Sequence, residues 1–195
     1  MPSETDPIFQ RIDLTSGAPY PKMHYVKRLL WNVVQHTLFR YSGSRMMKFR
    51  VRLVRLFGGD IAMTANMRPT CLIRHPWLLT MGEWSTIADH VNVYNLGPIS
   101  IGAHSVVSQH AHLCAGTHDY LKPDLPLLRP PITIGPGVWV CADAFIGPGV
   151  TIGANSMVGA RSCVMRDVPP GVIVAGNPAK VIKDRPMNAP AAGPA

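Results

Sequence analysis

The chain has 195 residues, 47% apolar and 15% charged, which is typical of one globular domain with appendages rather than of a disordered chain. Its 19 Lys and Arg against 11 Asp and Glu give a net charge of +8, which indicates an ordinary basic surface or an anionic partner. No apolar span, leader peptide, nucleotide-binding or nucleic-acid-binding motif occurs, so we expect a cytoplasmic protein. The four cysteines are too far apart for a metal clip or a disulfide framework.

Residues 1–57 predict an irregular segment followed by a helical cap. Residues 1–22 look irregular, and residues 23–57 predict two helices broken near residues 42–44. The second helix carries basic residues at helical spacing beside apolar ones, namely Arg45, Lys48, Arg52 and Arg55 beside Met46, Phe49, Leu53 and Leu56. We favour a cap on the open end of a solenoid. The alternative is peripheral contact with an anionic membrane.

A six-residue repeat dominates the rest of the chain. From Ile134 it reads IGPGVW, VCADAF, IGPGVT, IGANSM, VGARSC and VMRDVP, each opening on Ile or Val with a small or β-branched fifth residue in most hexads. The same register extends upstream through Ile101, Ile87 and Met81, and more weakly to Ile61. Neither a helix nor a simple strand has this period.

A period of six predicts an all-β core, namely a left-handed parallel β-helix of about five triangular coils over residues 58–185. Three hexads make one coil, so Ile134 should stack on Ile152, and Val140 on Val158. The coil openers at 61, 81, 101, 134 and 152 give coils of 20, 20, 33 and 18 residues. The extra residues always follow the third hexad, so they should emerge at one edge of the prism.

The longest interruption is a loop over residues 119–133, which contains four prolines and directly follows His118. Long loops in compact domains are usually functional or disordered, and prolines stiffen this one. We expect His118 to close the third hexad of its coil at the root of this loop. Residues 186–195 predict a disordered tail.

Five segments carry a family resemblance: VYNLGPISIG (93–102), HAHLCAGTHDY (110–120), PPITIGPGVWVCADAFIGPGVTIG (130–153), VGARSCVMRDVPPG (158–171) and VAGNPAKVI (174–182). They resemble the hexapeptide-repeat acyltransferases, most closely the colanic-acid-type O-acetyltransferases and the maltose, galactoside and nodulation acetyltransferases. The resemblance covers most of residues 27–185. It implies a homotrimer with active sites between neighbouring prisms, acetyl-CoA as donor, and a histidine general base that matches His118.

Acetyl transfer to a hydroxyl requires removal of the hydroxyl proton and a donor to the thioester oxygen. A near-neutral imidazole suits the first task and a backbone N–H the second. Asp119 follows His118 and is a candidate to orient its ring. Asn95 lies one coil earlier, where stacking predicts a place beside the His118 strand. It is a candidate to hold the acceptor or tune the imidazole, or alternatively a plain turn residue.

The resemblance also assigns a donor side. It implies that Trp139, Ala142 and Ala160 lie along the pantetheine arm, with the Ala142 N–H directed at the thioester oxygen. Phosphates of coenzyme A need cations, and four lie near the last coil and tail: Arg161, Arg166, Lys180 and Lys183. We assign no nucleophilic role to any cysteine.

Four histidines, His104, His110, His112 and His118, suggest a rival metal site of the carbonic-anhydrase type. Proteins of that type resemble one another in having two histidines five residues apart, whereas the successive histidines here are six, two and six residues apart. We therefore expect no metal. The sequence favours an O-acetyltransferase acting on a sugar hydroxyl in exopolysaccharide or surface-glycan synthesis. The alternatives are another hydroxyl or amine acceptor, or a non-catalytic scaffold.

Overall fold

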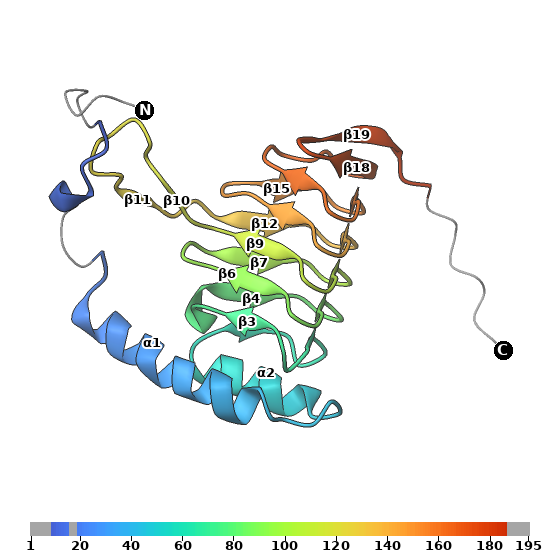
Figure 1. Ribbon diagram of the computed structural model, residues 1–195. Helices are drawn as coiled ribbons and strands as arrows, with labels where there is room; N and C mark the ends of the chain where they lie inside the picture. Colours follow the sequence, from blue (N-terminus) through green and yellow to red (C-terminus); the bar gives the residue numbers. More distant parts are fainter. Residues whose placement is uncertain (1–8, 16–18, 187–195) are drawn as a thin grey trace.

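The computed structural model describes residues 9–15 and 19–186, which form a stack of parallel β coils with helices at one end (Figure 1). Residues 1–8 and nearly all of the predicted tail at 186–195 lie outside the described residues. The helical elements are η1 (Ile12–Leu14), α1 (Lys22–Val34), the π-helical turn η2 (Gln35–Phe39), α2 (Met47–Leu56) and η3 (Pro76–Leu78). No helix in the described ranges is long and apolar enough to cross a bilayer.

Three parallel sheets form the faces of the stack. The first sheet contains β1 (Asp60–Ile61), β4 (Leu79–Met81), β7 (Ile99–Ile101), β12 (Ile132–Ile134) and β15 (Thr151–Ile152). The second contains β2 (Asn66–Met67), β5 (Thr86–Ile87), β8 (Val106–Val107), β13 (Trp139–Val140), β16 (Met157–Val158), β18 (Val172–Gly176) and the antiparallel β19 (Ala179–Asp184). The third contains β3 (Leu72–Ile73), β6 (Asn92–Tyr94), β9 (His112–Cys114), β14 (Phe145–Ile146) and β17 (Cys163–Val164).

The predicted register is confirmed. Ile134 pairs with both Ile101 and Ile152, and Val140 pairs with Val158. The β-helix prediction is therefore correct, but the expected five coils are too few, because the stack has about six turns. The last turn was missed because Val168 pairs with Ile152 only 16 residues earlier, which breaks the six-residue period.

The corners of the stack explain several polar residues. The fourth residue of a hexad adopts a positive φ, as at Gly137 (68°) and Gly149 (80°), but also at His104 (58°) and His110 (60°). The fifth residue is buried, which its small or β-branched side chain allows. His104 and His110 are therefore corner residues, with backbone positions set by the coil rather than by a ligand.

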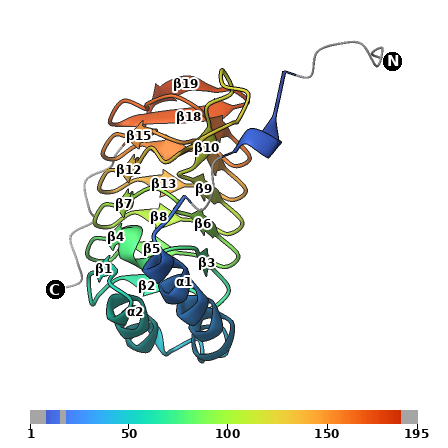
Figure 2. The same cartoon turned by 90° about the vertical axis from the view of Figure 1, so that its left-hand side faces the viewer.

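The helices cover the end of the stack that begins with β1 and β2 (Figures 1 and 2). Val51 and Val54 of α2 are fully buried, and the Trp31 indole of α1 donates a 2.6 Å hydrogen bond to the carbonyl of Ile73. Arg50 is also fully buried and donates to the Met67 carbonyl and to three oxygens of residues 42–44. Its charge is thus compensated by hydrogen bonds, although burial still lowers its pKa.

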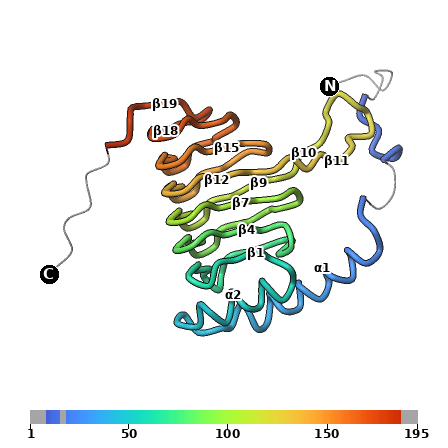
Figure 3. Tube along the Cα trace, turned by 180° about the vertical axis from the view of Figure 1, so that it is seen from behind, coloured from blue at the N-terminus to red at the C-terminus, as the bar shows by residue number. Residues whose placement is uncertain are grey.

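One hairpin leaves the stack, and we call residues 117–131 the excursion (Figure 3). Its strands β10 (Thr117–His118) and β11 (Leu127–Leu128) pair antiparallel, so the departure begins two residues before the expected loop. The shorter extras behave differently. Residues 79–80 and 99–100 lengthen β4 and β7 in register instead of projecting.

The N-terminal segment closes over the tip of the excursion. The Arg11 N–H donates to the Pro123 carbonyl at 2.8 Å, and the Thr15 hydroxyl donates to the Asp124 carbonyl at 2.9 Å. The excursion is therefore held by residues more than one hundred positions earlier in the chain.

Candidate functional site

His118 lies exposed at the end of β10, and its ring has one defined partner. The Nδ1 atom is 2.6 Å from the carbonyl oxygen of Leu125. A carbonyl can only accept, so Nδ1 carries the hydrogen. The Nε2 lone pair of the neutral ring is then free for a proton from a bound hydroxyl, which is the arrangement a general base requires.

Leu125 provides this carbonyl from an unusual backbone conformation. Its φ is 44°, a left-handed value that is uncommon for a bulky residue. The Leu125 N–H donates to the Lys122 carbonyl at 3.1 Å, which closes the turn. Sequence reasoning missed Leu125, because no pattern in the chain marks a leucine that adopts a left-handed backbone conformation.

Asp119 organises the same turn rather than the His118 ring. Its Oδ1 accepts the Leu121 N–H at 3.2 Å, and its Oδ2 lies 3.7 Å from the Lys122 ammonium. The Nδ1 of His118, which Asp119 was a candidate to hold, is occupied by the Leu125 carbonyl. A direct role for Asp119 therefore stays a prediction without a contact to support it.

Asn95 is level with Ala115 and not with the His118 strand, because β10 has already left the stack. It is fully buried. Its Oδ1 accepts the N–H groups of Arg74 and His75 at 3.1 and 3.0 Å, and its Nδ2 donates to the His75 carbonyl at 2.6 Å. Within the described residues no hydrogen bond joins Asn95 to His118, so these contacts give it a structural role.

Asn95 also belongs to a cluster that the sequence did not reveal. The His75 Nδ1 lies 3.0 Å from the Asn95 carbonyl, so this nitrogen carries the hydrogen and His75 Nε2 must accept from His24 Nε2, 3.2 Å away. Tyr20 stacks on His24 at 4.1 Å, and Arg129 lies 4.6 Å over the Tyr20 ring. Burial lowers the pKa of His75 to about 4. The cluster ties the start of α1 to the stack and to the root of the excursion.

The predicted donor residues lie at another edge. Ala142 and Ala160 occupy equivalent corners of successive coils, between the second and third sheets, where the Arg161 N–H donates to the Ala142 carbonyl at 2.9 Å. Within the described chain their own N–H groups have no acceptor. Trp139 lies on the second sheet, half-exposed, and its indole donates to the Ser108 hydroxyl at 2.9 Å. His118 leaves after the third sheet, so one chain does not bring it to Ala142.

The four predicted phosphate ligands are only partly brought together. Arg166 and Lys180 line one pocket of about 390 Å³ beside Pro178. Lys183 lies on β19 opposite Ile173. The Arg161 guanidinium is exposed and 3.8 Å from the Asp143 carboxylate. Arg166 and Lys180 therefore make a cationic pocket at the end of the stack.

The histidines and cysteines provide little other chemistry. In residues 9–15 and 19–186, no three His, Cys, Asp or Glu side chains are close enough to hold a metal ion. His110 stacks on His90 at 5.0 Å, and burial lowers the pKa of His112. Burial raises the pKa of the Cys71 thiol to about 12 and also raises those of Cys114 and Cys141. These thiols are therefore protonated near neutral pH.

Comparisons with known proteins agree with this geometry. The family described as bacterial transferase hexapeptide (six repeats) matches residues 131–166. The putative colanic acid biosynthesis acetyltransferase WcaF of Escherichia coli K12 is 44% identical over 160 residues, covering 82% of this chain and 88% of that protein. Galactoside O-acetyltransferase of the same organism is 38% identical over 99 residues, covering 51% of this chain and 43% of that protein.

Solved structures share the whole fold. A galactoside acetyltransferase in complex with coenzyme A superposes with a TM-score of 0.78 at 26% identity, covering 92% of this chain and 91% of that one. A hexapeptide-repeat acetyltransferase of Vibrio cholerae, complexed with acetyl coenzyme A, gives 0.76 at 26% identity, covering 88% and 94%. With the coil register and the relative at 44% identity, these matches show that the chain belongs to the hexapeptide-repeat family of acyltransferases.

Proposed function

We propose that this protein transfers acetyl from acetyl-CoA to a hydroxyl of a sugar in exopolysaccharide or surface-glycan assembly. The observation that carries the proposal is the exposed His118 ring, whose Nδ1 is held by the Leu125 carbonyl so that Nε2 is free to accept a proton. The relatives support the acceptor class, because one is named for colanic acid biosynthesis and others for galactoside. The neighbours with bound coenzyme A or acetyl coenzyme A support the donor.

The residues divide the reaction between them. His118 Nε2 takes the proton of the acceptor hydroxyl as its oxygen forms a bond to the thioester carbonyl carbon. The free N–H of Ala142 donates to the carbonyl oxygen as negative charge develops there. When the carbon–sulfur bond breaks, the His118 imidazolium returns its proton to the departing thiolate. Acetyl-CoA supplies only the activated acyl group.

The positions of these residues favour an active site shared between subunits. His118 and Ala142 lie at different edges of one prism, and a neighbouring copy would bring the two edges together. We therefore propose a homotrimer. A light-scattering mass of three chains is expected, and a stable monomer with full activity would contradict the shared site.

The donor side fits the charge of coenzyme A. Arg166 and Lys180 line a common pocket, and Lys183 lies on the same terminal hairpin. These cations suit the phosphates, while Trp139 and the Ala142 and Ala160 corners suit the uncharged arm. Arg161 can join them only by leaving Asp143.

The decisive experiment measures thiol release from acetyl-CoA over a panel of sugars, other alcohols and amines. We compare the protein with His118→Asn, and use His104→Asn as the matched control because His104 is an exposed corner histidine. His118→Asn should lower kcat by about 10²–10⁴-fold, and His104→Asn should change it little. Full activity of His118→Asn would refute the base assignment. If no acceptor gives turnover and coenzyme A does not bind, the scaffold alternative stands.

A further inference from the structure

The positive charge of this protein is concentrated in its helical end. Between Asp13 and Asp60 the chain has no Asp or Glu and nine Lys and Arg, whereas the rest of the chain has 10 Lys and Arg against 11 Asp and Glu. Arg50 is buried in the cap, but six of the other cations are exposed: Lys22, Arg40, Arg45, Lys48, Arg52 and Arg55. These six exposed cations therefore belong to the helical end of the stack (Figure 1).

Helix α1 has a second apolar face that points away from the coils. Val26, Leu29, Leu30 and Val33 follow the spacing i, i+3, i+4 and i+7, and they are 52%, 65%, 55% and 58% exposed. The opposite side of the helix carries Trp31, which is fully buried. A helix packed on a globular core normally needs only one apolar stripe. The outward stripe therefore has no role in the cap.

The apolar surface continues into a groove where η2 meets α2. This groove of about 380 Å³ is lined mainly by Leu38, Tyr41, Met46 and Phe49. The apolar stripe of α1 and this groove, with the six exposed cations, are called here the basic–apolar surface.

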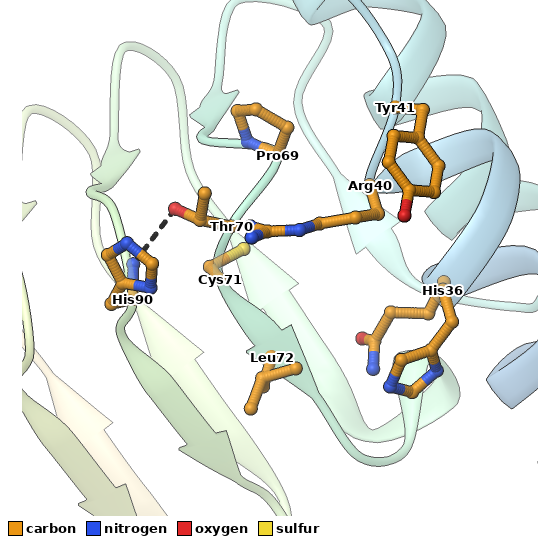
Figure 4. Close-up of a pocket in the computed structure, with 9 residues that line it drawn as sticks. His36, Arg40, Tyr41, Pro69, Thr70, Cys71, Leu72 and His90 are labelled. Carbon is orange, nitrogen blue, oxygen red and sulfur yellow. Dashed lines mark hydrogen bonds between the residues drawn. The ribbon is translucent and has the colours of Figure 1, made fainter.

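A cationic pocket adjoins the groove and shares Tyr41 with it (Figure 4). The pocket measures about 340 Å³, and the Arg40 side chain extends across it from the helix toward Thr70 (Figure 4). Among the described residues the Arg40 guanidinium has no hydrogen-bond or ion-pair partner. Gln35, only 5% exposed, uses its Oε1 on the Ile73 N–H and leaves its Nε2 without a protein acceptor in the described chain. The pocket therefore offers donors to an anion beside an apolar groove.

We propose that the basic–apolar surface docks on an anionic lipid bilayer. The Val26, Leu29, Leu30 and Val33 side chains enter the headgroup layer, and the exposed cations contact lipid phosphates. The Arg40 pocket receives one lipid phosphate, and the groove behind Tyr41 receives part of an adjoining lipid acyl chain. Because α1 and α2 lie at one end of the stack, the coils then stand away from the membrane (Figures 1 and 2).

Charge favours a lipid surface over a second copy of this chain. Residues 60–195 hold eight Asp and Glu against nine Lys and Arg, so they offer no acidic excess. Several carboxylates already lie within 4.0 Å of a cation of the same chain: Asp13, Asp89, Asp119 and Asp143. Docking of a second copy would therefore place the basic–apolar surface on a surface that is neutral or basic and cannot neutralise its cations.

The test is co-sedimentation of the full chain with vesicles of phosphatidylcholine, alone or mixed with 30–40% phosphatidylglycerol (about a third anionic lipid). We expect binding to the anionic vesicles, little binding to the neutral ones, and release as salt rises, because salt screens exposed charges. Binding that is equal on both vesicles, or absent from anionic vesicles at low salt, overturns the proposal.

Three variants locate the surface. Lys48→Gln with Arg52→Gln should lower partitioning about 25-fold, at about fivefold for each cation near the bilayer. Leu30→Ser with Val33→Ser should lower it roughly tenfold or more. Arg40→Gln should lower it about fivefold. Lys122→Gln on the excursion and Val106→Ser on β8 are matched controls that should bind as the parent does.

Two further measurements separate other outcomes. The three surface variants should keep the parent's melting temperature and its acetyl transfer to a free sugar, because their changed side chains are exposed and belong to the helical end, away from the excursion that carries His118. If Leu30→Ser with Val33→Ser instead reduces the light-scattering mass and leaves vesicle binding unchanged, the stripe joins copies of the chain and the proposal fails. Failure of vesicle binding would leave the proposed acetyl transfer untouched.

Discussion

The stack and the excursion are built in opposite ways. In the stack, each strand pairs in parallel with an equivalent strand one coil away, so a residue's position follows from its own hexad. The excursion has one short antiparallel pair, and its tip is held by the Arg11 and Thr15 contacts from the other end of the chain. The stack thus sets a frame by local repetition, whereas the excursion places the histidine through contacts distant in sequence.

The largest expected effect tests the frame alone. Ile101 stacks between Met81 and Ile134, so Ile101→Ala should lower the free energy of unfolding by about 2–5 kcal/mol. Val106→Ala, at a half-exposed position of the same coil, should cost much less. Chemical denaturation measures both. Equal losses would show that the inward position does not carry the stability of the coil.

Lowering the pH should destabilise the junction between the stack and the excursion by protonating His75. Its folded pKa of about 4 is below the ordinary 6.5, so the folded state binds fewer protons than the unfolded one. The contribution of the neutral ring is complete above pH 6.5 and is lost as pH falls through 4, by on the order of 3 kcal/mol. Denaturation across this window should show the loss. In His75→Leu that part of the pH dependence should vanish, and an unchanged slope would contradict it.

Asn95 distinguishes a frame residue from a catalytic one. Asn95→Ala leaves the His75 N–H without a partner, whereas the Arg74 N–H still donates to the Val93 carbonyl and the His75 carbonyl still accepts from the Leu78 N–H. Unfolding should therefore become easier by about 1–3 kcal/mol. Asn92→Ala is the control, because among the described residues the Asn92 side chain makes a single hydrogen bond, a 3.5 Å one between its Nδ2 and the His112 Nε2. If Asn95→Ala keeps its stability but loses acetyl transfer, Asn95 belongs to the chemistry after all.

The smallest expected effect probes the excursion itself. Leu125→Gly accommodates the positive φ and keeps the carbonyl, so acetyl transfer should stay within about twofold of the parent. Leu125→Pro cannot adopt a φ of 44° and should turn the carbonyl away from His118, which lowers kcat by roughly tenfold. The pH–rate profile should change only in the proline variant. Similar kinetics for both variants would show that the Leu125 carbonyl does not hold the base.

The sequence was sufficient for the frame, because the opener and fifth residue of each hexad determine its pairing locally. It failed at the last turn, where the step from Ile152 to Val168 has only 16 residues. It marked His118 as the candidate base through a motif and its position, but it marked neither the Leu125 carbonyl nor the His24–His75 contact. Those depend on how the excursion folds back and how α1 crosses the coils, which no local pattern records.

The coils that exceed eighteen residues take up the extra length at a single corner. At residues 79–80 and 99–100 the addition continues a strand in register, and at residues 117–131 it forms a hairpin, while the strands of the other two sheets keep their pairing. Under the proposed function, that corner carries the acceptor side, and the corner of Ala142 and Ala160 carries the donor side. In such a prism, the edge on the acceptor side can change in length and sequence to suit new acceptors, while the other edge keeps the site for a common acyl donor.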